Sequence, residues 1–304
     1  MLNQKMDYQE NVSGVIVVDK PLGLTSHDVV QVVRKGVGLR RVGHTGTLDP
    51  RASGVLVVLI GPAVRLSEYV SASDKRYQAT IRLGSATDTY DTEGKITLIS
   101  KVNVTENEFA EQLSLFVGEI EQTPPPFSAV KVQGRKAYEL SRKGLDVELK
   151  PRKIHVYRLD ILDWDVPDVI IDVYCSSGTY VRSLAHDLGK VLGCGAHLVG
   201  LRRTKSGRFT LRDANQLDKL KDDFVSGDWH KHLIPAADAL SEWHAVELSV
   251  EQMQLIRNGR RIQASPEDPN VARGINEQGE LVAILEKNID TCEWCPKKVF
   301  SQEE

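Results

Sequence analysis

Residues 43–60 read GHTGTLDPRASGVLVVLI, and this stretch decides the fold and points to the reactive part of the chain. Its last six residues, 55–60, are entirely apolar and predict a strand buried on both faces. The preceding twelve residues hold three glycines and one proline, which predict a shaped loop around Asp49. Catalytic side chains collect on loops anchored to rigid strands, so Asp49 and His44 are candidates for chemistry. The alternatives are an Asp-Pro turn residue and a hydrogen-bonded loop histidine.

Strands and helices alternate irregularly outward from this stretch. Apolar runs or alternation predict strands at 15–18, 76–83, 169–175 and 281–286. Helical spacing predicts helices at 25–36, 104–116 and 181–192, with loops at 36–53 and 88–94. Because the elements lack regular βαβ spacing, the predicted class is α+β with a mixed, largely antiparallel sheet.

The chain divides into two predicted domains. Its 304 residues suit about two domains, and we expect a larger one at 1–245 and a small β-rich one at 246–304. A basic, mixed stretch at about 128–153 is expected to be an arm or insertion of the larger domain.

Composition and cysteine content indicate an ordinary globular protein. The chain is 41% hydrophobic and 27% charged, which excludes a collagen-like or wholly disordered chain. The longest uncharged apolar run, 54–64, is too short to span a bilayer, and no secretion signal is expected at the N-terminus. Four cysteines in 304 residues do not form a disulfide framework, so a reduced, cytoplasmic location is expected.

Charge is unevenly distributed. The net charge of −3 by itself argues against a polyanionic partner. Residues 131–160, however, hold nine Lys or Arg against four acids, and 34–41 and 201–212 hold four and five bases with no acid. A polyanion responds to such local clusters rather than to the total. Solvated protein faces are the alternative, and the charges alone leave both interpretations open.

The motifs indicate neither a metal nor a nucleotide site. The chain lacks a Walker loop, a dinucleotide fingerprint and the HExxH metal motif. The single CxxC pair, Cys292 and Cys295, is a weak zinc signal because a structural zinc needs four ligands. We therefore expect no metal and no cofactor.

Six motifs in order resemble one known family. Numbered at their first residues, the motifs are Asp19-Lys-Pro-Leu-Gly, Gly43-His-Thr-Gly-Thr-Leu-Asp-Pro, Lys75-Arg-Tyr, Gly84-x-x-Thr-Asp-Thr-Tyr-Asp-x-Glu-Gly, Pro124-Pro-Pro-Phe-Ser-Ala-Val-Lys and Ser177-Gly-Thr-Tyr-Val-Arg-Ser-Leu-Ala. Together they resemble the TruB family, the bacterial tRNA pseudouridine-55 synthases, from residue 14 to about 210. The last sixty or so residues resemble the PUA-type RNA-binding module of that family. One departure is Ala-Ser-Gly after the Asp-Pro, where many members have Ala-Thr-Gly; serine keeps the hydroxyl.

The resemblance implies a reaction and the residues that perform it. Members isomerise uridine to pseudouridine at position 55 in the T-loop of tRNA, after the base is flipped out of its stack. Asp49 matches the aspartate nucleophile, Arg182 the active-site arginine and Tyr77 the tyrosine that stacks on the target base. An isomerisation needs no redox cofactor, ATP or metal.

Four further residues match substrate-binding or supporting positions. Tyr180 and Leu201 match apolar walls of the base pocket, and His44 matches the residue that fills the place of the flipped base. Lys20 matches a lysine that we interpret as supporting the catalytic loop; the alternative is a capping or surface lysine. The implied partner is the tRNA T-arm, with no membrane, no guide RNA and a monomeric enzyme.

Three alternatives remain at this point. The first is an RNA-binding folding chaperone with secondary or lost catalysis. The second is a guide-dependent synthase of the related archaeal and eukaryotic branch. The third is a zinc-containing RNA binder built on Cys292 and Cys295. The sequence also leaves open whether Asp49 attacks uracil carbon 6 or ribose carbon 1′.

The basic clusters generate a salt-dependence prediction. Affinity for tRNA should fall steeply as salt rises, because neutralising phosphates releases counterions. Replacing Arg142 and Lys143 by glutamate should flatten the slope of log affinity against log salt. The measurement is a binding titration at several salt concentrations, and equal affinity at low and moderate salt would contradict the role of these clusters.

Overall fold

Strand β3 (Ala52–Ile60) confirms the strand predicted from the apolar run, since its residues 55–60 are completely buried. In this computed structural model the described residues are 12–128, 130–132, 134–137 and 149–300. They form two units, and β3 contributes to both: residues 52–54 belong to the second unit and 55–60 to the first. Gly54 has φ +102°, and a Cβ there would lie 2.2 Å from the carbonyl oxygen of Arg203, so this position requires glycine.

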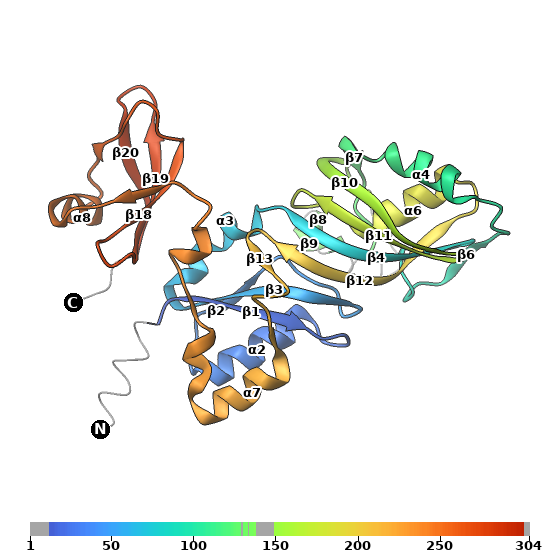
Figure 1. The fold of residues 1–304 in the computed structure, drawn as a ribbon, viewed down its shortest axis with the longest axis horizontal. Helices are drawn as coiled ribbons and strands as arrows, with labels where there is room; N and C mark the ends of the chain where they lie inside the picture. The colour runs from blue at the N-terminus through green and yellow to red at the C-terminus, as the bar shows by residue number, and fades with distance from the viewer. Residues whose placement is uncertain (1–11, 129, 133, 138–148, 301–304) are drawn as a thin grey trace. The chain divides into compact units, whose positions relative to one another are not determined.

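The first unit comprises residues 1–50, 55–71 and 208–304. β1 (Gly14–Lys20) lies between β3 and the parallel strand β14 (Asn215–Gln216), while β2 (Val42–Thr45) pairs with β3 and β15 (Ile234–Pro235) with β1. Helix α2 (Ser26–Val37) begins with a capping box between Thr25 and Asp28 and buries four valines. It packs against α7 (Leu217–Ser226), where a Cβ at Gly36 would overlap the ring of Phe224 (Figure 1).

The C-terminal residues form a separate sheet within this first unit. Its strand order is β16-β18-β19-β20-β17, which confirms the β-rich fold predicted for this stretch. The elements are β16 (Ala245–Glu247), α8 (Val250–Arg257), β17 (Ile262–Gln263), β18 (Val271–Ile275), β19 (Leu281–Asn288) and β20 (Glu293–Val299). A core around the buried Trp294 and Ile256 holds the sheet to α8. The boundary at residue 245 stays a prediction.

The second unit, residues 51–54 and 72–207, is built on a mixed sheet. Its order is β3-β12-β4-β11-β10-β7; only the β3–β12 pair is parallel, so the predicted mixed, largely antiparallel α+β class is confirmed. The strands are β4 (Lys75–Leu83), β7 (Gly118–Gln122), β10 (Arg152–Asp165), β11 (Asp168–Cys175) and β12 (Ala196–Ser206). Helices α4 (Glu106–Ser114) and α6 (Val181–Val191) pack on this sheet and on each other (Figure 1).

The remaining elements are short. They are η1 (Gly61–Leu66), α3 (Ser67–Ser71), β5 (Ser85–Thr87), β6 (Ile96–Ile99), β8 (Lys131–Val132), β9 (Arg135–Lys136), β13 (Phe209–Thr210), η2 (Asp228–His232) and η3 (Asp238–Leu240). None of the helices in the described ranges is long and apolar enough to cross a membrane.

Two expectations need correction. The predicted loop at 36–53 contains the end of α2 and strand β2, whose sequence Val-Gly-His-Thr is too short and too polar to signal a strand. The arm predicted at 128–153 ends in β10, because Arg152 and Lys153 begin that strand. Two register shifts in β10 interrupt the two-residue period by which a strand is recognised. Residues 129, 133 and 138–148 of the arm, including Arg142 and Lys143, lie outside the described residues.

Candidate active site

The loop that carries Asp49 is held on both sides of that residue. Leu48 N–H donates to Ser26 Oγ over 2.8 Å, and Ser26 Oγ donates to the Leu48 carbonyl oxygen over 3.0 Å. After Asp49, the Pro50 carbonyl oxygen accepts from the Gly23 N–H over 2.8 Å. Ser26 and Leu48 are both buried, while Asp49 itself is half-buried. The segment 23–26 therefore holds both chain neighbours of Asp49.

Lys20 and His44 come from the same unit as Asp49. Lys20 is completely buried at the end of β1, and its Nζ donates to the carbonyl oxygens of Pro21 (2.9 Å) and Leu24 (2.6 Å). These bonds hold the turn from which Gly23 reaches Pro50, and a surface position for Lys20 is excluded. His44 is half-buried in β2, opposite Val58 of β3.

Tyr77 and Leu201 share one face of the second unit's sheet. Tyr77 in β4 is buried, and the residue opposite it in β12 is Arg203. Leu201 lies opposite Ala79, two residues further along β4, so Tyr77 and Leu201 are diagonal neighbours on adjacent strands. The structure therefore brings these two predicted site residues together.

Tyr180 stands at the N-cap of α6, where a side chain from β7 holds its backbone. The Gln122 amide accepts from Tyr180 N–H over 2.8 Å and donates to the Tyr180 carbonyl oxygen over 3.0 Å. The guanidinium carbon of Arg152 lies 5.4 Å from the centre of the Tyr180 ring, within the range of a cation–π contact. The start of α6 is thus tied to the end of β7.

Arg182, the second residue of α6, forms a largely buried ion pair with Asp91. Its Nη1 donates to Asp91 Oδ2 over 3.1 Å and its Nη2 to the Phe127 carbonyl oxygen over 3.2 Å. The two side chains are only 10% and 15% exposed, so solvent screens the pair little. Asp49 and Arg182 belong to different units.

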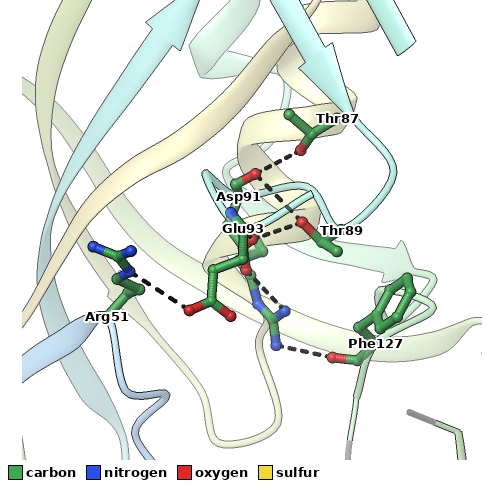
Figure 2. A network of polar contacts seen from close by, with 7 residues as sticks. Arg51, Thr87, Thr89, Asp91, Glu93 and Phe127 are labelled. Atoms are coloured by element: carbon green, nitrogen blue, oxygen red, sulfur yellow. Dashed lines mark hydrogen bonds and ion pairs between the residues drawn. The ribbon is translucent and has the colours of Figure 1, made fainter. Parts of the chain in front are cut away.

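Asp91 is itself held by its own loop (Figure 2). Its Oδ1 accepts from the Thr89 hydroxyl (2.6 Å) and the Glu93 N–H (3.0 Å), and its carbonyl oxygen accepts from the Thr87 hydroxyl (2.7 Å). Glu93 also lies 3.5 Å from Arg51, but both side chains are more than half exposed, so this pair contributes little stability. These bonds aim one carboxylate oxygen of Asp91 at Arg182.

Sequence reasoning missed Asp91, Gln122 and Ser26. Asp91 ends the Thr-Asp-Thr-Tyr-Asp part of the motif that begins at Gly84, so its signal was present without a role attached. Ser26 lies at the start of the helix predicted at 25–36, and no predicted element or motif includes Gln122. Their partners are 22 and 58 residues away in the chain, beyond the reach of any local pattern.

Two titratable groups in the second unit's sheet, where β4 begins and β11 ends, have shifted pKa values. Burial, together with the charge of Arg203, lowers the pKa of Lys75 to about 8. Burial raises the pKa of the Cys175 thiol, which lies opposite Lys75, to about 12. Cys175 is therefore a protonated, unreactive thiol at neutral pH.

The described ranges contain no cluster of three or more His, Cys, Asp or Glu that could hold a metal. Cys292 donates from Sγ to the Ala264 carbonyl oxygen over 3.4 Å, and Trp294, between the two cysteines in the chain, is buried in the C-terminal core.

Comparison with known proteins defines the class and then the family. The profile described as "TruB family pseudouridylate synthase (N terminal domain)" matches residues 34–181, and that of the "tRNA pseudouridylate synthase B C-terminal domain" matches 182–241. Relatives named tRNA pseudouridine synthase B include one from Syntrophobacter fumaroxidans, 44% identical over 82% of this chain and 81% of its own length. Another, from Solibacter usitatus, is 42% identical over 90% and 96%.

Solved structures agree with this class. A Cbf5-Nop10-Gar1 complex gives a TM-score of 0.75 at 28% identity, covering 98% of this chain and 86% of that chain. An H/ACA RNP bound to a substrate RNA containing 2′-deoxyuridine gives 0.75 at 27%, covering 98% and 87%. The fold and these matches make the chain a pseudouridine synthase. It belongs to the TruB family.

Ser26 provides a test of how the Asp49 loop is held. Ser26→Ala removes both bonds to Leu48, and we expect kcat to fall by roughly tenfold to a hundredfold, because small misplacements of a reacting group are that costly. The affinity for tRNA should stay the same. The matched control is Thr25→Ala, which removes the cap of the same helix and costs about 1 kcal/mol of stability without touching Leu48. Equal kcat values for the two variants, measured well below their melting temperatures, would contradict this role.

The Arg182–Asp91 pair predicts separable effects on stability and turnover. Arg182→Met leaves the Asp91 carboxylate buried without its cation, so we expect a loss of about 3–5 kcal/mol in the free energy of unfolding. Turnover should fall by about a hundredfold or more. Adding Asp91→Asn should recover much of the stability and none of the turnover, whereas Arg182→Lys should recover part of the turnover. Urea unfolding and single-turnover assays measure both, and near-normal turnover of Arg182→Met would contradict an active-site role.

Proposed function

We propose that this chain isomerises uridine to pseudouridine in tRNA, at position 55 of the T-loop. The observation that carries the proposal is identity of 42–46% to three relatives named tRNA pseudouridine synthase B over 82–90% of this chain. The bonds around Asp49 agree with it, because a nucleophile on a loop must be held in place to react.

In the proposed reaction, Asp49 is the nucleophile. The bond between uracil N1 and ribose C1′ breaks, a bond between C5 and C1′ forms, C5 loses a proton and N1 gains one. Substrate and product are isomers, so the reaction requires no co-reactant. Asp49 attacks either uracil C6 or ribose C1′, and in both cases the carboxylate must be ionised.

A base pocket that excludes water disfavours the charged form of the Asp49 carboxylate, and a nearby cation stabilises that form. Arg182 is the cation we propose. Its bonds to Asp91 and Phe127 hold the guanidinium in one orientation. Asp91 then acts through Arg182 as a positioning residue.

The other predicted residues receive roles in binding. Tyr77 stacks on the flipped uracil and assists removal of the C5 proton, with Leu201 and Tyr180 as walls of the pocket. His44 fills the space that the uridine leaves in the T-loop, because an emptied stack is costly. Lys20 supports the Asp49 loop through the turn at residues 21–24.

The proposed partner is the T-arm of tRNA, contacted by the basic arm at 128–153 through phosphates and shape. We assign catalysis to residues 1–245 and RNA binding to a PUA-like domain at 246–304. The enzyme acts as a monomer in the cytoplasm, without guide RNA. The related structures in H/ACA and Cbf5-Nop10-Gar1 complexes favour testing the guide-dependent alternative directly.

The test is incubation of the purified chain with unmodified tRNA transcript alone, followed by mapping of pseudouridine to the nucleotide. We expect modification at uridine 55. Modification only after addition of a guide RNA would support the guide-dependent alternative, and binding without modification would support a folding chaperone.

Asp49→Asn should abolish turnover and leave tRNA binding largely intact, since an amide is nearly isosteric with a carboxylate but is a poor nucleophile. The matched control is Asp218→Asn on the exposed surface of α7, which should react at the normal rate. Rates of pseudouridine formation check the prediction. A rate for Asp49→Asn within about tenfold of the unchanged chain would exclude Asp49 as the nucleophile.

A further inference from the structure

The residue before Asp91 has an unusual backbone conformation. Tyr90 has φ +66°, and among the described residues the only other non-glycine residue with positive φ is Cys292. This left-handed region is unfavourable for a bulky L-residue, so neighbouring contacts must hold it there. The conformation matters because it sets the direction in which the side chain of the next residue, Asp91, points.

A ring stack holds the Tyr90 side chain. The rings of Tyr90 and His186 are 3.6 Å apart at their centres and nearly parallel, at 12°. The backbone is held as well, because the Tyr90 carbonyl oxygen accepts from the Leu198 N–H over 3.0 Å. The side chain and the carbonyl oxygen of Tyr90 are thus each held by a residue distant in the sequence.

His186 comes from the same helix as Arg182. The two are four residues apart in α6 and therefore lie on one face, one turn apart. His186 contacts Tyr90 and Arg182 contacts Asp91, so two consecutive residues of one loop are held by consecutive turns of one helix.

His186 serves as a flat neutral ring in this arrangement. Its Nδ1 is buried and makes no hydrogen bond within the described part of the chain. Burial and the charge of Lys190 lower the pKa of His186 to about 4. Protonation would also place a third cation between Arg182 and Lys190, each four residues away in α6, although Asp187 lies beside it.

We propose that the Tyr90–His186 stack is a positioning pair that keeps Tyr90 in its left-handed conformation and thereby aims Asp91 at Arg182. Neither ring takes part in the chemistry. The effect on turnover rests on the proposed function, because it acts through Arg182; the effect on the Asp91–Arg182 pair does not.

The first test needs no activity. The coupling between Asp91 and Arg182 is measured from urea unfolding of Asp91→Asn, Arg182→Met and the double variant. The same cycle is repeated with His186→Ala throughout. We expect the coupling to fall to less than half when His186 is alanine. An unchanged coupling overturns the proposal even if the chain is active on tRNA.

The second test uses turnover on tRNA transcript. His186→Ala should lower kcat by about tenfold to a hundredfold, with KM changed by less than about twofold. His186→Phe keeps a flat ring and should recover most of the rate. The matched control on the same helix is Lys190→Ala, which removes an exposed side chain and should leave the rate unchanged.

A third test separates positioning from a merely structural role. If the stack acts through Asp91, His186→Ala should cause no further loss of kcat in an Asp91→Asn background; a merely structural role predicts that the two losses multiply. Independent, multiplying losses would overturn the proposal, as would failure of His186→Phe to recover the rate. An unchanged chain that forms no pseudouridine would refute the proposed function, while the unfolding cycle would still decide the role of the stack.

Discussion

The two bonds between the Ser26 hydroxyl and the backbone of Leu48 are the constraint on which the Asp49 loop depends. Residues 46–51 lie outside helix and strand, so no ladder of backbone hydrogen bonds shapes them. Ser26 belongs to the capped first turn of α2, and Gly23 belongs to a turn held by the buried Lys20. The position of Asp49 is thus derived from the rigid elements β1 and α2.

The second unit uses the start of α6 in a comparable way. A cation in the first turn of a helix opposes the helix dipole, at a cost of roughly 0.3–1 kcal/mol. The largely buried Asp91 carboxylate offsets this for Arg182, while Gln122 of β7 holds Tyr180 and Tyr90 stacks on His186 of the same helix. A helix terminus that is unfavourable for arginine by itself is stabilised by the Asp91 carboxylate and the Phe127 carbonyl oxygen, both from outside the helix. Arrangements of this kind are typical of functional sites rather than of folding cores.

In the basic clusters, tertiary structure reduces the number of positive charges that are available to bind RNA. Arg34 donates to the Val42 carbonyl oxygen, Arg208 donates to that of Asp238, and Arg203 is completely buried. Lys153 and Arg158 form ion pairs with Glu119 and Asp160. Part of each cluster is therefore committed to the fold, and the charge offered to RNA is smaller than the local sequence indicates.

The sequence by itself determined the α+β class, strands β1, β3, β4, β11 and β19, helices α2, α4 and α6, the family and Asp49 as the central candidate, but not strands β10 and β12 or helix α7. Periodicity and helix capping depend on residues a few positions apart, and each motif is a continuous stretch. These features can therefore be recognised from the sequence alone. Tertiary structure alone decided the partners: Ser26 for Leu48, Asp91 for Arg182 and His186 for Tyr90. The members of each pair are separated by 22 residues or more, and only folding makes them neighbours. Strand β10 was missed for a related reason, because its bulges form through pairing with β11 and interrupt the alternation that a strand otherwise shows.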